Sequence, residues 1–134
     1  MAGCTGTRPR DLGVAAGVLR ACPGTPNCVS SEAGTPADRL VAPLPAPAGA
    51  TDLSRLAELL AAWPRTTVVL QRADYLHVES TSRLLRFVDD VEFRYDTAAK
   101  VIQVRSASRL GRKDFGVNRD RVERIRSEWA ARSK

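Results

Sequence analysis

The chain is poor in the residues that most often bind metals or anchor a protein in a membrane. Its 134 residues include one histidine, three cysteines and one methionine, and aromatic residues make up only 5%. A structural zinc site takes four His or Cys ligands, so this inventory argues against one, and we expect neither a metal nor a cofactor. No apolar run approaches the roughly 18–20 residues of a membrane-spanning helix.

Proline is unevenly placed, and its distribution suggests how the chain is organised. Seven of the eight prolines precede residue 50, where Pro43, Pro45 and Pro47 alternate with other residues in a pattern typical of an extended segment. The length fits one domain. We therefore predict a flexible tether over residues 1–20, a cysteine loop and Pro-rich linker over 21–50, and a compact domain over 51–132.

Two of the cysteines lie close together around turn-forming residues. Cys22 and Cys28 enclose Pro23, Pro26 and Asn27, residue types that favour turns. A disulfide would bring the two Cα atoms within about 7 Å of each other. Two free thiols in a turn remain the alternative, because disulfide use depends on the compartment.

Hydrophobic periodicity predicts the elements of the compact domain. A helix begins after Thr51 or Asp52, either of which can cap it, and ends before Pro64. A final helix covers residues 118–131, with Asn118 as its cap. The apolar stripes of the two helices are Leu53, Leu56, Leu60 and Trp63 in the first, and Val122, Ile125 and Trp129 in the second. Period-two runs predict strands over residues 66–72, 75–81, 87–95 and 100–106.

This order of elements indicates an α+β fold. We expect a four-stranded antiparallel meander preceded by an extended tether, with the N-terminal and C-terminal helices packed on one face. Trp63 and Trp129 should then both be largely buried in the same core. A four-residue loop over 96–99 would pair Tyr95 with Lys100, and this register places Arg105 opposite Asp90.

The stretch that follows the last strand is the best candidate for a binding site. Junctions between strand, turn and helix can bring backbone donors and cationic side chains to one anionic group. The candidate residues are Arg105, Ser106, Ser108, Arg109, Asn118 and Arg119. Our leading hypothesis is a non-enzymatic binding or accessory module that recognises a small anion there. The alternative is that these arginines only form structural ion pairs, with Asp89 and Asp90 among their partners.

A small enzyme is the first functional alternative. His77, the only histidine, shares a strand face with Tyr75 and Glu79, and could act with Asp89 or Asp90 as an acid or base. Asp89 and Asp90 must point to opposite faces of a regular strand, so they cannot act as a pair. No G-x-S-x-G sequence accompanies the serines.

Charge supplies the second alternative. Residues 1–104 carry 11 Lys/Arg and 11 Asp/Glu, whereas residues 105–134 carry 10 Lys/Arg and 4 Asp/Glu. A basic C-terminal helix could bind an anionic membrane surface. Nucleic acid is not an expected partner, because no exposed aromatics alternate with the arginines and no reading motif is present.

Several segments together resemble one family. They are Cys22-Pro-Gly-Thr-Pro-Asn-Cys-Val-Ser-Ser31, Tyr75-Leu-His77, Phe87-Val-Asp-Asp-Val-Glu-Phe93, Val104-Arg-Ser-Ala-Ser-Arg109 and Asp114-Phe-Gly-Val-Asn-Arg119. In this order, over residues 20–127, they resemble the domain of unknown function 1499 family of bacteria and plastid-bearing eukaryotes. The resemblance supports the fold boundaries and the place of the site, and it implies no particular reaction.

The first residues are similar to part of a lipoprotein signal. Met1-Ala2-Gly3-Cys4 resembles the end of a lipobox, and bacterial members of the family often look like lipoproteins. Cys4 is therefore a candidate lipidation site, with a hydrophobic leader lost from this chain. A cell-envelope or periplasmic location follows if the leader was removed, and a cytoplasmic one otherwise. Expected partners are thus a small anionic ligand, or a membrane surface through lipidated Cys4.

Overall fold

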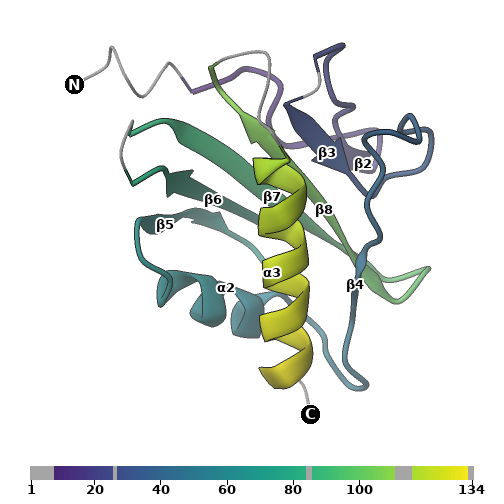
Figure 1. Cartoon of the computed structure of the whole chain (residues 1–134). Helices are drawn as coiled ribbons and strands as arrows, with labels where there is room; N and C mark the ends of the chain where they lie inside the picture. The colour runs from purple at the N-terminus through teal and green to yellow at the C-terminus, as the bar shows by residue number, and fades with distance from the viewer. Residues whose placement is uncertain (1–7, 26, 84–85, 111–115, 133–134) are drawn as a thin grey trace.

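A six-stranded sheet organises the protein (Figure 1). The computed structural model describes residues 8–25, 27–83, 86–110 and 116–132. The sheet order is β3 (Cys28–Ser30), β8 (Val101–Ser108), β7 (Val88–Asp96), β6 (Tyr75–Thr81) and β5 (Thr66–Gln71), and β4 (Leu44–Pro45) pairs with a second stretch of β8. Neighbouring strands are antiparallel. The predicted α+β class is confirmed.

The sheet is larger than the predicted four-stranded meander because two strands come from residues expected to form a linker. β3 pairs with one half of β8 and β4 with the other, so the early chain covers what would have been an open sheet edge. Residues expected in a flexible tether are also ordered, since β1 (Val14–Ala15) and β2 (Val18–Leu19) form a small hairpin. Ala16 and Gly17 both have positive φ at its turn, as a tight two-residue hairpin turn requires.

Two helices flank the meander in sequence and contribute to one core. Helix α2 (Ser54–Ala61) begins where Asp52 accepts a hydrogen bond from the backbone N–H of Ser54, at 3.0 Å. Helix α3 (Val117–Arg132) follows Gly116 and runs across the sheet (Figure 1). The core joins their buried residues to the sheet face that carries Val91, Phe93 and Val104. None of the described helices is long and apolar enough to span a bilayer.

The two tryptophans differ in burial. Trp129 is 4% exposed, and its indole N–H donates to the Pro45 carbonyl oxygen at 2.9 Å. Trp63 is only partly buried and packs at the margin of the core, where it donates to Glu128 at 2.8 Å. The prediction of two largely buried rings in one core therefore holds for Trp129 and only in part for Trp63, which follows the end of α2 and packs at the margin of the same core.

The hairpin between β7 and β8 has its loop one residue further along the chain than predicted. Asp96 stays in the strand opposite Val101, and Tyr95 pairs with Ile102 instead of Lys100. The Asp96 carboxylate accepts the N–H of Ala99 at 3.0 Å, and Lys100 adopts a left-handed conformation. This turn keeps every side chain on its predicted face but changes each cross-strand partner.

The predicted disulfide is present. Cys22 and Cys28 are bonded, with their Cα atoms 5.7 Å apart. Cys28 belongs to β3, so the bond ties the preceding loop to the edge of the sheet next to β8. Arg39 also holds this loop, donating to the carbonyl oxygens of Pro23 and Gly24.

Candidate anion-binding site

The sheet has a second face, opposite the helices, on which charged residues are buried in rows. One row crosses three strands and consists of His77, Glu92 and Arg105. The next row consists of Glu79, Asp90 and Ala107. We call this surface the arm face, because residues 8–13, here called the arm, lie against it. His77, Asp90, Glu92 and Arg105 are all buried there.

Asp90 links a histidine to an arginine. Its carboxylate lies 2.7 Å from His77 Nε2 and accepts two hydrogen bonds from Arg109, at 2.8 and 2.9 Å. Burial alone would raise the pKa of Asp90, but the hydrogen bonds from Arg109 and His77 bring it below its ordinary value. Asp90 is therefore an acceptor at neutral pH, so His77 Nε2 carries the proton that it donates. Arg109 also donates to Glu79 at 2.5 Å.

Glu92 lies at the centre of the arm face. One of its oxygens accepts a hydrogen bond from the Tyr75 hydroxyl at 2.5 Å, and the other lies 3.2 Å from Arg105. Burial, together with the neighbouring Glu92 carboxylate, raises the pKa of Tyr75 and keeps its hydroxyl a donor. The predicted register placed Arg105 opposite Asp90. The shifted hairpin places it opposite Glu92 instead.

The arm contacts this face through polar groups. Asp11 forms a 2.8 Å ion pair with Arg105, and the backbone N–H of Gly13 donates to Glu92 at 2.6 Å. Arg8 pairs with Glu79 at 2.7 Å. These three contacts give the buried charges partners that the sheet itself does not supply.

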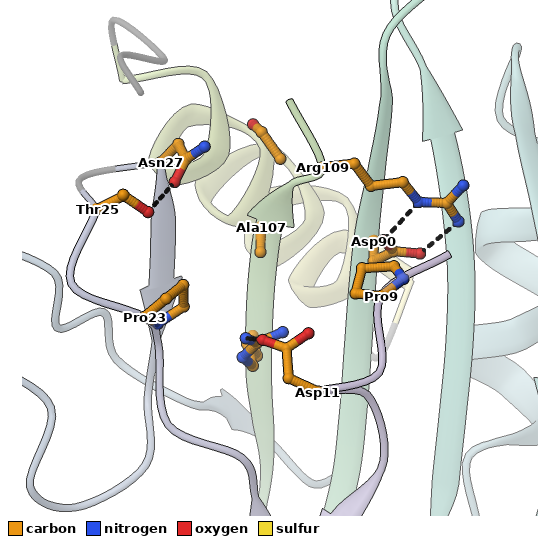
Figure 2. Close-up of a pocket in the computed structure, with 10 residues that line it drawn as sticks. Pro9, Asp11, Pro23, Thr25, Asn27, Asp90, Ala107 and Arg109 are labelled. Carbon is orange, nitrogen blue, oxygen red and sulfur yellow. Dashed lines mark hydrogen bonds and ion pairs between the residues drawn. The ribbon is translucent and has the colours of Figure 1, made fainter. Parts of the chain in front are cut away.

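A cavity of about 340 Å³ lies beside the arm (Figure 2). Its lining includes Arg105, Arg109, Asp11 and Thr25, so the disulfide loop and the arm form opposite walls. Ala107 lies between the two arginines along β8 and leaves the space that a larger side chain would fill. Figure 2 shows Asp11 on the arm, and the Arg109 side chain extending toward Asp90 on the side away from Thr25.

Arg105, which lines this cavity, has a buried donor with no partner among the described residues. Arg105 is 1% exposed, and among the described residues nothing accepts a hydrogen bond from its Nε–H. An unsatisfied buried donor is costly, at about 1–3 kcal/mol. Arg39 Nε is also without a partner in the described part of the chain, but Arg39 does not line the cavity. Arg105 is therefore the side chain best suited to accept an additional anionic group.

The other predicted site residues lie on the helix face of the sheet. Ser106 and Ser108 both contact Asn118, at 2.6 and 2.9 Å. Strand alternation sends Arg105 to the opposite side, so the predicted patch joining Arg105, Arg109 and Asn118 is not formed. Asn118 is not a helix cap either, since it lies within α3 and is fully buried.

Arg121 completes this second cluster, which clamps α3 to the sheet. It donates to Asp89 at 2.6 Å and to Asn118 at 2.9 Å. Asp89 was expected to pair with Arg109, which instead lies on the arm face. Burial raises the pKa of Asp89, although the Arg121 guanidinium opposes this shift. The contacts of this cluster account for it structurally.

The remaining arginines of α3 also attach the helix to other parts of the protein. Arg119 donates to the carbonyl oxygens of Asp38 and Leu40, and Arg126 donates to those of Ala42 and Pro43. Three further arginines of the described helix have intramolecular partners as well: Arg121, Arg124 and Arg132. The excess positive charge of the C-terminal region therefore serves in part to dock the helix.

Three residues on the arm face are arranged as metal ligands could be, but an arginine already pairs with two of them. One ligand atom from each of His77, Glu79 and Asp90 lies within 4.8 Å of the others. Arg109 bonds to both carboxylates of this group and so provides the positive charge that a cation would bring.

Comparison with known proteins assigns the chain to a family. The model of a family described as proteins of unknown function, DUF1499, matches residues 18–129. The chain belongs to the DUF1499 family. No match was found among curated proteins or among solved structures. The predicted resemblance is thus confirmed, and the cavity beside Arg105 is built largely from residues within the DUF1499 match.

Two site residues were missed because they precede the DUF1499 match. Arg8 and Asp11 pair with residues far along the chain, and no local pattern around them signals a partner. Glu92 carried a better signal, since it alternates with Asp90 along a strand. Such a polar stripe is typical of a solvent-facing surface, so the local pattern does not indicate that the arm covers it.

Proposed function

We propose that the protein binds a small anionic group, a carboxylate or a phosphate, in the cavity between Arg105 and Arg109. The observation that carries this proposal is the fully buried guanidinium of Arg105, whose Nε–H has no partner among the described residues. A planar guanidinium binds two oxygens of one anion with good geometry. The lining also includes Thr25, whose hydroxyl donates to Asn27 Oδ1 at 2.6 Å.

Asp11 occupies part of the position that such an anion would take. Its carboxylate accepts a hydrogen bond from Arg105 Nη2, while its side chain remains 45% exposed. The positive charges of Arg105 and Arg109 are already neutralised by the buried carboxylates of Glu92 and Asp90. A further anion therefore binds favourably only when the Asp11 carboxylate moves away. Binding is therefore expected to be a competition between Asp11 and the ligand for one guanidinium edge.

Titration with inorganic phosphate and with acetate, followed by NMR, tests the proposal. We expect shifts at Arg105, Arg109 and Ala107, and loss of these shifts in Arg105→Lys, which keeps the charge but removes the planar fork. Ala107→Leu should also abolish binding by filling the cavity, without changing any charge. Arg55→Lys, on the exposed side of α2, is the matched control. Unchanged affinity in both site variants would refute the proposal.

A second candidate function uses His77. His77 lines another cavity, of about 630 Å³, together with Tyr75 and Leu70. The Asp90 carboxylate, 2.7 Å from His77 Nε2, fixes the orientation of the imidazole ring. This arrangement supports proton transfer to or from a bound substrate. His77→Gln distinguishes the two candidates, because a binding module should keep its anion affinity whereas an enzyme should lose turnover.

Binding to an anionic membrane through α3 stays a prediction with less support. Every described arginine of the helix has an intramolecular partner, which reduces the charge available to lipid headgroups. Vesicles containing anionic lipid, at low and high salt, test this alternative.

We infer an envelope location from the disulfide. Such bonds persist in oxidising compartments, and Cys22 and Cys28 are bonded. Cys4 lies outside the described residues, so its lipidation stays a prediction, which mass spectrometry of the protein purified from its native membrane tests.

A further inference from the structure

The structure points to a peptide-binding groove on the arm face, in which the protein's own arm is an internal ligand. An acidic peptide segment of a partner would replace the arm there. This inference rests on the anion site proposed above and names its ligand as the carboxylate of an extended peptide.

The arm contacts the sheet as a bound peptide would. The Asp11 side chain meets Arg105, and two residues later the Gly13 backbone N–H meets Glu92. Arg105 and Glu92 lie directly opposite each other on β8 and β7, so the two contacts form one receptor. Together these two residues bind a carboxylate and, two residues later, a main-chain N–H donor. A peptide offers both groups at a fixed spacing.

The receptor is rigid while its occupant is held weakly. Arg105 and Glu92 are 1% and 0% exposed and fix each other by an ion pair. The arm side chains are open to solvent: Asp11, which pairs with Arg105, is 45% exposed, and Arg8, which pairs with Glu79, is 57% exposed. Arg105 and Glu92 remain paired with each other when the arm leaves, so the arm can be exchanged without unfolding the sheet.

The arm also fills the groove incompletely. The cavity of about 340 Å³ lies on one side of it and the cavity of about 630 Å³ on the other, and Pro9 lines both. The larger cavity has an apolar wall that includes Val69 and Leu70, next to Leu12 of the arm. A partner peptide with an Asp or Glu in place of Asp11 and a larger apolar residue in place of Leu12 would fit better than the arm does.

Fluorescence polarisation with a labelled peptide tests this inference on the full chain. The probe is the sequence of residues 8–13, Arg-Pro-Arg-Asp-Leu-Gly, and a matched peptide has Asn in place of Asp. In the Arg8→Ala/Asp11→Asn double variant the arm loses two of its contacts. We expect this variant to bind the Asp peptide about tenfold more tightly than the wild type does, and about tenfold more tightly than it binds the Asn peptide. Asp38→Asn, an exposed carboxylate outside the groove, is the control and should behave as the wild type.

Acetate, titrated into the same double variant, separates this inference from the proposed function. If acetate shifts Arg105 but the Asp peptide binds no more tightly than acetate or the Asn peptide, the peptide groove is wrong and the anion site stands. If neither acetate nor peptide perturbs Arg105, both are wrong. A weak peptide affinity of the double variant could result from misfolding, so a second variant is needed. Ala107→Asn, made in the same double variant, provides this test. It narrows the cavity beside Asp11 without removing a charge, and we expect it to weaken peptide binding about tenfold. Unchanged binding there would also contradict the groove.

Discussion

The two faces of the sheet are covered by different means. The helix face meets α2 and α3 through a continuous apolar core that includes Leu56, Phe93 and Ile125. The arm face meets residues 8–13 through ion pairs and hydrogen bonds to buried charges such as Glu92 and Arg105. Apolar burial needs no particular partner geometry, whereas a buried charge is stable only with its partners in place.

This difference separates a structural surface from a candidate functional one. Charges buried beneath a short polar segment are an expensive way to stabilise a small domain, because hydrophobic residues would serve as well or better. The polar cluster on the helix face, by contrast, joins Arg121 and Asp89 where α3 docks, and its charges pair within the protein. We therefore expect mutations on the two faces to have different signatures.

The largest expected loss of stability comes from the helix face. Trp129→Ala should lower the free energy of unfolding by about 3–5 kcal/mol, because it removes a large buried ring from the core. Trp63→Ala should cost clearly less, since that ring is only partly buried. Urea unfolding measures both, and equal losses would contradict the assigned core.

Breaking the charge network on the arm face should cost somewhat less. Asp90→Ala should lower the free energy of unfolding by about 3 kcal/mol, at the lower end of the cost of breaking a buried pair, because a cavity adjoins Arg109. Asp38→Ala, at an exposed carboxylate, is the control. A loss no larger than that of the control would mean that the network is not important for stability.

The pH dependence of two neighbouring aspartates should have opposite signs. Asp90 has a lowered pKa, so its stabilising contribution is present above its ordinary pKa and is lost as the pH falls through its folded value. Asp89 has a raised pKa, so its contribution is present below 3.8 and is lost as the pH rises through its folded value. As the pH rises from about 2 to about 4, Asp90→Asn should therefore become more destabilising relative to the wild type, whereas Asp89→Asn should become less destabilising as the pH rises above about 4. Urea unfolding across both pH ranges measures this, and the same trend in both variants would contradict the assignment.

The smallest stability effect belongs to the arm. Arg8→Ala should change the free energy of unfolding by less than about 1 kcal/mol, since its ion pair with Glu79 is exposed on one side. Hydrogen exchange at the Gly13 amide should nevertheless become faster, because the arm opens more often. Arg55→Ala should leave that amide unchanged, and slow exchange in both variants would show that Arg8 does not hold the arm.

Much of the fold could be predicted because the chain repeats a simple pattern there. Period-two runs marked β5 to β8, and the apolar stripes marked both helices, so element types and faces were right. The register of the β7–β8 hairpin was not, because two four-residue loops fit the same alternation. The Asp96 side chain and the left-handed Lys100 select between them, and that choice depends on local turn geometry.

The parts that could not be predicted depend on pairing between distant segments. β3 and β4 are too short to show the two-residue hydrophobic period of a strand, and Pro45 makes the β4 sequence resemble a linker. They become strands because β8 offers them partners. The candidate site was only half right for a related reason. Arg105 and Arg109 line the cavity, but alternation along β8 places Ser106 on the opposite face with Asn118.

The resonance of the Arg105 Nε–H tests the central claim most directly. In the free protein this buried donor has no partner among the described residues, and an anion bound beside Arg109 would give it one. Adding acetate or phosphate should move this resonance and slow its exchange with water, and Asp11→Asn should reduce the anion concentration required. The Arg55 resonance is the control for non-specific effects of the added anion and should not move. An Arg105 Nε–H resonance that stays in place in both the wild type and Asp11→Asn would contradict the claim.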